Sequence, residues 1–259
     1  MPTDWNAASY DKVADPQARW GAEVLARLPL EGDEAVLDAG CGTGRVTELL
    51  LSRLPRGRVV ALDASASMLE QARGRLGRFG DRVTYAQADL ERPLPIAEPV
   101  DAVLSTATFH WVLDHDALFA NLAAVLRPGG WLVAQCGGFG NVDTLLRVAA
   151  EVHPGFHRVH NFQTAEATRA RLERTGFDRI ETWLSQAPTS FDTPEQFEAF
   201  LETVCLRTFL GELPAEARPA FIHEVAARLP ERTLDYVRLN ITARRASIAI
   251  DLLSSGSHS

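Results

Sequence analysis

The chain is 259 residues long, with 46% hydrophobic and 23% charged residues, and it carries a formal net charge of −8. This length and composition are typical of a globular protein with one large domain or two small ones. An acidic surface repels phosphate backbones, so we expect no nucleic acid as a partner. No apolar run approaches transmembrane length, and we expect no membrane attachment.

The first half of the chain alternates apolar strands with amphipathic helices. Residues 5–30 are expected to form an amphipathic helix that ends near Pro29. Five strands are predicted at 35–39, 58–62, 83–86, 100–105 and 131–135. Helices at 45–53, 67–76 and 115–126 lie between them, with Ser65 or Ser67 as the N-cap of the second helix. This alternation predicts a parallel, doubly wound sheet with right-handed crossovers.

The second half of the chain is less regular. Helices are predicted near 142–152, 165–174, 194–210 and 215–229, and strands at 177–185 and 233–244. The two helices between the last strands form an expected helical cap at 194–229. The fold class is therefore α/β, with a Rossmann-like, seven-stranded, mostly parallel sheet, an N-terminal helix, and a cap inserted before the last strand.

A glycine-rich turn follows the first predicted strand. Gly40, Gly42 and Gly44 come directly after Asp38 and before an amphipathic helix. Glycines at this place allow a positive φ or the close approach of a ligand, and ligands of open α/β sheets bind at the carboxyl ends of strands. A dinucleotide site would need a further glycine at position 45, where the chain has Arg45, so the pattern does not favour a pyrophosphate.

Three carboxylates end the first three strands. Asp38 can accept from a ligand ammonium and would repel a phosphate. Asp63 closes the second strand, where an acid can accept both hydroxyl protons of a ribose. Asp89 follows the third strand and can accept from an exocyclic amine. A ligand with an ammonium, a ribose and an amino-bearing base, but no phosphate, is S-adenosylmethionine.

These residues resemble the motifs of the class I S-adenosylmethionine-dependent methyltransferases. Residues 38–44 look like that family's first motif, Asp63 matches its ribose-binding acid, residues 88–90 resemble its adenine-side motif, and residues 126–130 look like the turn before the fifth strand. The resemblance implies an enzyme that binds S-adenosylmethionine. The expected cofactor-binding residues are Asp38, Gly40, Cys41, Gly42, Gly44, Asp63, Ala64, Met68, Asp89, Leu90 and Ser105.

A narrower resemblance concerns the acceptor. Residues 4–6 with Tyr10, the aromatic segment 109–111 and the stretch 206–210 look similar to trans-aconitate methyltransferases, which esterify a carboxylate of a small polyacid. A carboxylate is already ionised at neutral pH and needs no base. For a hydroxyl or amine acceptor, His110 could be the general base, and this catalytic role stays open beside a structural one.

Four further residues are candidates for binding the acceptor. Tyr10 and Trp111 could approach a sulfonium through cation–π contacts or exclude water. His157 and Arg207 could hold an anionic substrate, since arginine captures carboxylates bidentately. No metal site is expected, because Pro154 and Gly155 break the histidine-rich stretch.

The predicted organisation is one methyltransferase domain over residues 1–253. It comprises a helical segment at 1–30, a cofactor-binding core at 31–137 and an acceptor-side half at 138–253, followed by a disordered tail at 254–259. Three widely spaced cysteines without a Cys-x-x-Cys pair favour reduced thiols and a cytoplasmic location. The first residues also lack the basic and apolar regions of a signal peptide.

The sequence leaves several functions open. We expect methyl transfer to a small molecule, with a carboxylate oxygen as the leading acceptor and a monomer or homodimer as the assembly. The alternatives are C- or N-methylation in natural-product biosynthesis, an NAD-dependent oxidoreductase, and a protein that binds the cofactor without catalysis. Fold alone does not decide among them.

Overall fold

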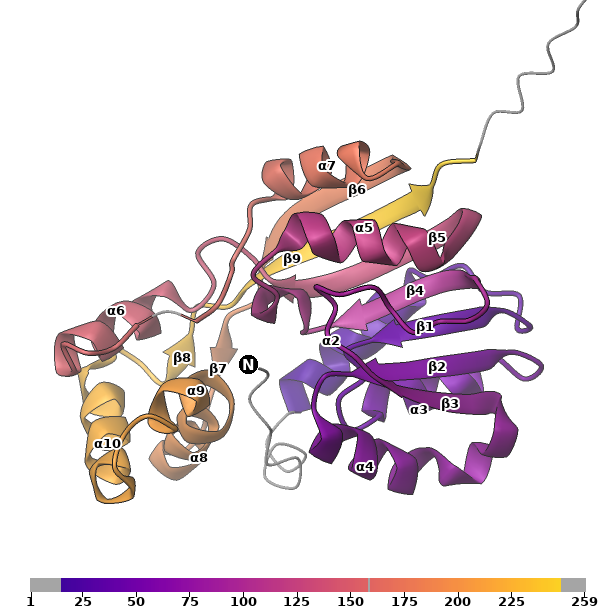
Figure 1. Cartoon of the computed structure of the whole chain (residues 1–259). Helices are drawn as coiled ribbons and strands as arrows, with labels where there is room; N and C mark the ends of the chain where they lie inside the picture. The colour runs from indigo at the N-terminus through magenta and orange to yellow at the C-terminus, as the bar shows by residue number, and fades with distance from the viewer. Residues whose placement is uncertain (1–14, 158, 248–259) are drawn as a thin grey trace, which may run out of the picture.

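The fold is built around one seven-stranded sheet (Figure 1). The computed structural model describes residues 15–157 and 159–247. The strand order is β3-β2-β1-β4-β5-β9-β6, and the strands from β3 to β5 pair in parallel, whereas β9 pairs antiparallel with both β5 and β6. The strands are β1 (Ala35–Ala39), β2 (Arg58–Asp63), β3 (Val83–Gln87), β4 (Val100–Thr106), β5 (Leu126–Gly137), β6 (Phe177–Gln186) and β9 (Val237–Arg245).

Helices cover both faces of the sheet, as expected for a doubly wound fold. The helices are α2 (Asp15–Ala26), α3 (Arg45–Ser52), α4 (Ala66–Leu76), α5 (His115–Val125) and α7 (Ala165–Arg174). Val36 on β1 packs with apolar residues of α2, α3 and α4, whereas its neighbour Leu37 packs with those of α5 and α7. All five residues of β1 are buried because adjacent side chains point to opposite, covered faces.

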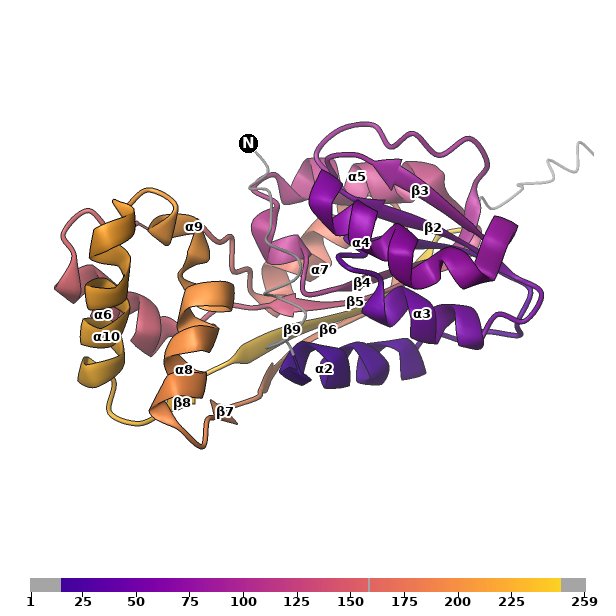
Figure 2. The ribbon, with the colours of Figure 1, turned by 90° about the horizontal axis from the view of Figure 1, so that it is seen from below.

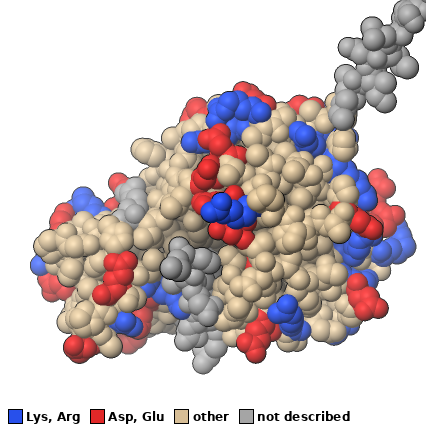
Figure 3. Space-filling view, viewed as in Figure 1, with Lys and Arg blue, Asp and Glu red and all other residues tan. Residues whose placement is uncertain are grey.

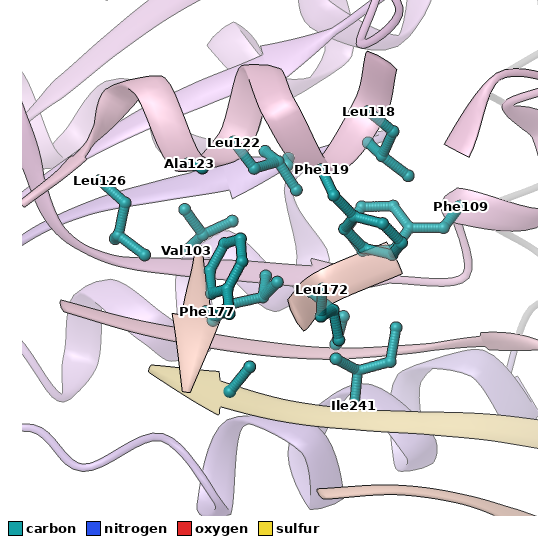
Figure 4. Close-up of a cluster of buried hydrophobic side chains, with 14 of the residues drawn as sticks. Val103, Phe109, Leu118, Phe119, Leu122, Ala123, Leu126, Leu172, Phe177 and Ile241 are labelled. Atoms are coloured by element: carbon teal, nitrogen blue, oxygen red, sulfur yellow. The ribbon is translucent and has the colours of Figure 1, made fainter. Parts of the chain in front are cut away.

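The core under α5 and α7 is the larger of the two sheet-facing cores. Phe119 and Leu122 of α5, Leu172 of α7 and Ile241 of β9 meet over Val103 of β4 (Figure 4). Each is buried from solvent. This packing holds the antiparallel strand β9 against the parallel part of the sheet and so fixes the position of the residues at its start.

A helical cap lies beyond the carboxyl ends of the parallel strands (Figures 1 and 2). Its helices are α6 (Asp143–Val152), α8 (Pro194–Phe200), α9 (Arg207–Leu210) and α10 (Arg218–Arg228), with a small sheet of β7 (Thr189–Ser190) and β8 (Thr233–Leu234). These helices share an apolar core of their own, which also takes in Trp20 of α2. The cap thus includes α6, from a segment outside the predicted cap at 194–229.

The prediction of one continuous helix at 194–210 is wrong. A π-helical turn, Leu201–Cys205, separates α8 from α9, with the Leu206 amide bonded to the Leu201 carbonyl. The spacing of the buried residues Phe197, Phe200 and Leu201 of the first helix is repeated by Leu206, Phe209 and Leu210. The step of five from Leu201 to Leu206 does not fit an α-helix, and one π turn restores both sets to the core face.

The predicted strand at 233–244 is also divided. Residues 233–234 pair with β7 as β8, and only Val237–Arg245 join the main sheet. Asp235 lies between them and accepts hydrogen bonds from the Thr144 amide and hydroxyl at the start of α6. The predicted helix at 5–30 is seen from Asp15 to Ala26 as α2, and residues 5–14 lie outside the described residues.

Candidate functional site

The turn between β1 and α3 holds three glycines with positive φ. Gly40, Gly42 and Gly44 have φ of 84°, 54° and 82°. The amide of Gly40 donates to the Leu62 carbonyl at 2.8 Å, which ties the turn to β2. A Cβ at Gly40 would overlap the Thr108 side chain, whereas one at Gly42 would meet no atom of the described residues within 4 Å. The backbone at Gly42 therefore faces open space, which lets a ligand approach closely.

Asp38 lies under this turn and is almost fully buried. Its Oδ2 accepts from the Thr47 hydroxyl at 2.6 Å, while its buried Oδ1 has no hydrogen-bond partner among residues 15–157 and 159–247. Burial, and to a lesser extent the charge of Asp63, raises the pKa of Asp38 to about 7. A buried acceptor without a donor is costly, and a ligand ammonium is a group that would satisfy it.

Asp63 joins the glycine turn to the start of α4. Its Oδ2 accepts from the Gly42 amide at 2.8 Å and its Oδ1 from the Ser65 amide at 2.9 Å. Burial raises the pKa of Asp63. Each carboxylate oxygen keeps a second lone pair for a ligand hydroxyl, so Asp63 can orient the turn and bind a ribose at once.

Replacing Asp63 by alanine is expected to weaken the affinity for S-adenosylhomocysteine at least about tenfold, because charge-assisted hydrogen bonds are lost. The Gly42 amide also loses its acceptor in this variant. Titration calorimetry measures the affinity, with Glu70→Ala on the exposed side of α4 as a control. An unchanged affinity in Asp63→Ala would contradict the assigned role.

The remaining cofactor candidates come from the segments that follow β2 and β3. Ser65 is the N-cap of α4 and accepts from the Met68 amide. The Ala88 amide donates to the Asp63 carbonyl at 3.1 Å, which places the end of β3 next to the end of β2. Asp89 is exposed and accepts from the Glu91 amide, while Met68 and Leu90 are buried.

Cys41 and Ser105 support the turn through the backbone. Burial is the largest cause that raises the pKa of Cys41 well above the usual value for a thiol, so the thiol stays neutral. The Ser105 hydroxyl donates to the Ala39 carbonyl at 2.6 Å, and the Thr108 hydroxyl donates to the Gly40 carbonyl at 3.2 Å. The loop after β4 is therefore fastened to the glycine turn.

A cavity of about 60 Å³ adjoins this loop, between the sheet and the cap. It takes its walls from the loop after β4, the start of α6, the segment before α7, the π-helical turn and the start of β9. The lining residues are Ala107, His110, Trp111, Asn141, Val142, His160, Phe162, Val204, Cys205, Tyr236 and Arg238. Ala107 links the two sites, since it follows Ser105 by two residues and lines the cavity.

His110 lies in this cavity as a buried side chain. Its Nδ1 accepts from the Gly137 amide at 3.2 Å, so in the neutral ring the proton is on Nε2. Burial, followed by the neighbouring His160 and Arg238, lowers the pKa of His110 well below 6.5. The ring is therefore a neutral hydrogen-bond donor at physiological pH.

Arg238 is the site residue that the sequence did not reveal. It is 3% exposed on β9, its Nε donates to Gln135 Oε1 at 3.4 Å, and its guanidinium carbon lies 4.5 Å from the ring centre of Trp20. Arginine before Leu239 in an apolar strand is the signal that could have found it. A stacked, buried guanidinium beside a cavity is suited to binding a carboxylate.

Of the acceptor residues predicted from sequence, Trp111 lines the cavity with His110. His157 and Arg207 are not among the lining residues: His157 is exposed, with its Nε2 3.4 Å from Glu212, and Arg207 begins α9. Tyr10 lies outside the described residues. Within the part of the chain that the structure describes, no three His, Cys, Asp or Glu side chains gather as metal ligands, and no helix is long and apolar enough to cross a membrane.

Figure 3 shows the distribution of charged side chains over one face of the molecule. Acidic and basic groups are interspersed there, with uncharged surface between them. Asp38 of the glycine turn and Arg238 of the cavity are both buried.

Comparison with known proteins places this geometry in a family. A family model described as a methyltransferase domain matches residues 36–130. Trans-aconitate 2-methyltransferase of Methylobacterium nodulans is 33% identical over 93% of this chain and 98% of its own length. The same-named protein of Methylobacterium radiotolerans is 30% identical over 94% and 99%.

A solved structure shares the fold. Phosphoethanolamine N-methyltransferase 2 of Haemonchus contortus, in complex with S-adenosyl-L-methionine, superposes with a TM-score of 0.63 at 22% identity, over 93% of this chain and 57% of that chain. The glycine turn, the Asp38 Oδ1 that has no donor among the described residues, and the open space beside Gly42 fit S-adenosylmethionine. This chain belongs to the class I S-adenosylmethionine-dependent methyltransferases and is an enzyme that methylates small molecules.

Proposed function

We propose that the enzyme methylates a carboxylate oxygen of a small organic acid. The observation that carries this proposal is Arg238, a buried cation that lines the cavity next to the cofactor turn. A guanidinium at the wall of a cavity is suited to binding the carboxylate of an acid substrate through two parallel hydrogen bonds. The relatives named trans-aconitate 2-methyltransferase support an acid as the acceptor.

S-adenosylmethionine supplies an electrophilic methyl group. The chain's own residues hold the other reactant: the Arg238 guanidinium binds the carboxylate and the His110 Nε2–H can donate to it. Trp111 and Tyr236 exclude water from the cavity. A carboxylate is a nucleophile at neutral pH without proton removal, so positioning and desolvation carry the rate.

His110 is a poor base in this arrangement. Its Nε2 already carries the ring proton, its Nδ1 lone pair accepts from the Gly137 amide, and a second proton on Nδ1 would create a cation near Arg238. An amine or hydroxyl acceptor would need a base to take its proton. The geometry therefore favours an acceptor, such as a carboxylate, that has no proton to lose.

The test is a product analysis. The enzyme is incubated with S-adenosylmethionine and a panel of acids, amines and phenols, and products are identified by mass spectrometry. We expect a methyl ester that dilute alkali converts back to the acid. A base-stable N-, C- or ether-methylated product, with no ester from any acid, would contradict the proposal.

His110→Ala separates the two chemistries independently. For a carboxylate acceptor, kcat at saturating cofactor should fall less than about tenfold, as for loss of one hydrogen bond. The wild-type kcat should also show no His110 titration from about pH 7 to 9, because the lowered pKa keeps the ring neutral there. Complete loss of turnover in the soluble, folded variant would identify a base.

A further inference from the structure

The segment 109–114 leads from β4 to α5 and carries His110 and Trp111, which line the cavity proposed for the acceptor. Its last residue, Asp114, is the N-cap of α5. The Leu113 side chain is 69% exposed, so packing in the apolar core does not fix this residue. Its position depends on hydrogen bonds of its backbone, which come from two different loops.

Glu91 binds this end of the segment from the cofactor side. Its Oε1 accepts from the Leu113 amide at 2.6 Å and from the Asp114 amide at 2.9 Å. The Glu91 amide donates to Oδ1 of Asp89 at 2.9 Å, and Asp89 is the acid that the sequence predicts to accept from the amino group of the cofactor's base. Glu91 therefore lies between the predicted adenine-binding acid and the segment that reaches the acceptor cavity.

Asn161, which precedes α7, binds the same segment from the acceptor side. Its Nδ2 donates to the Val112 carbonyl at 3.1 Å and to the Leu113 carbonyl at 2.8 Å. Its backbone amide donates to the His110 carbonyl at 2.8 Å. Leu113 is thus held at both of its backbone polar groups, the amide by Glu91 and the carbonyl by Asn161. These bonds form a contiguous network between Glu91 and His110, of the kind that carries coupling between sites.

We propose that Glu91 is a positioning residue that couples the occupancy of the cofactor site to the order of the acceptor cavity, through Leu113. A ligand base bound by Asp89 orders the loop after β3, and the Glu91 carboxylate then restrains the segment 109–114. The acceptor meets a wall that is already ordered, so less conformational entropy is lost when it binds. This inference goes beyond carboxylate methylation, because it holds for any acceptor that binds in the cavity.

Hydrogen exchange tests the coupling without an acceptor. The reporters are the amides of Trp111 and Val112, which donate to the carbonyls of residues 108–109. S-adenosylhomocysteine should slow their exchange in the wild type by a factor of at least about five. In Glu91→Ala, which keeps the reporters' own hydrogen bonds, the same ligand should slow it less than about twofold. Because coupling is reciprocal, Glu91→Ala should also weaken the affinity for S-adenosylhomocysteine by the factor seen in the wild-type exchange.

Two variants are the controls for the exchange experiment. Glu91→Gln keeps a side-chain oxygen that can accept from both amides, so it should retain the slowing to within about twofold. Glu98→Ala removes an exposed acid of the same loop, paired with Arg58 of β2, and should behave as the wild type. Equal slowing in the wild type and in Glu91→Ala, or no slowing in either, would overturn the inference.

Turnover provides a second arm, with the compound of the panel above that is methylated fastest. Glu91→Ala should raise the KM for this acceptor at least about fivefold and change kcat less than about twofold, since the ordering of the cavity affects binding. Asn161→Ala should act in the same direction. The loss in the double variant should be smaller than the product of the single losses, because both residues restrain Leu113.

Single losses that multiply in full in the double variant would contradict a shared path through Leu113. A base-stable methylated product would contradict the proposed function and leave this inference standing.

Discussion

Replacing Arg238 by glutamine is expected to lower kcat/KM for the acid acceptor by a factor of about 100, since removing one partner of a buried charge pair costs about 2–5 kcal/mol. Arg238→Lys should not restore the rate, because an ammonium cannot stack on Trp20 and offer two parallel donors. Steady-state kinetics with varied acid measures the loss. The affinity for S-adenosylhomocysteine should change less than threefold.

Arg244→Gln is the matched control for Arg238. It lies on the same strand, donates to the Gly129 carbonyl at 2.7 Å, and packs over Trp131 outside the cavity. This variant should keep the wild-type kcat/KM. If Arg238→Gln retained full activity, or lost cofactor affinity and acid turnover equally, Arg238 would be a structural residue and not the carboxylate anchor.

The position of Arg238 depends on a buried polar network on one face of the sheet. Gln135 Nε2 donates to Asn240 Oδ1 at 2.8 Å, and Asn240 Nδ2 donates to the Ser185 hydroxyl at 3.0 Å. This chain of bonds fixes the Gln135 amide so that its oxygen faces Arg238 Nε. Such networks are stable only when each member is satisfied, which restricts the guanidinium to one orientation.

The sequence was sufficient for the cofactor half of the fold. Strands such as β1 are apolar on both faces and end in acids or glycines, so their limits follow from local composition. The predicted cofactor residues could be located in the same way, because they stand at or just after the ends of consecutive strands. Comparison with known families confirms the methyltransferase assignment and contradicts the alternative of an NAD-dependent oxidoreductase.

The acceptor half could not be derived in the same way. Its cavity joins five segments separated by up to about half of the chain, and their meeting depends on tertiary packing. His157 and Arg207 were chosen because they are polar groups near a broken helix, whereas Arg238 looked like an ordinary strand residue. The π-helical turn and the division of 233–244 also arise from cap packing, which single-sequence periodicity does not report.

Replacing Asp38 by asparagine is expected to stabilise the ligand-free protein at pH 8 while weakening S-adenosylhomocysteine binding at least about tenfold. Burial raises the pKa of Asp38 from 3.8 to about 7, so ionisation of this carboxyl destabilises the folded state as pH rises between these values. Each pKa unit is worth about 1.4 kcal/mol, which sets an upper limit of about 4 kcal/mol on the gain.

Asparagine keeps an oxygen for the Thr47 hydroxyl but carries no charge for the ligand ammonium. Thermal denaturation without ligand should therefore give a higher Tm for Asp38→Asn at pH 8 and nearly equal values at pH 5, where the wild-type carboxyl is protonated. Wild-type affinity should fall about tenfold per pH unit below 7, and the variant should lack this dependence. A lower Tm for Asp38→Asn at pH 8, with unchanged affinity, would show that Asp38 stabilises the fold and does not bind the ammonium.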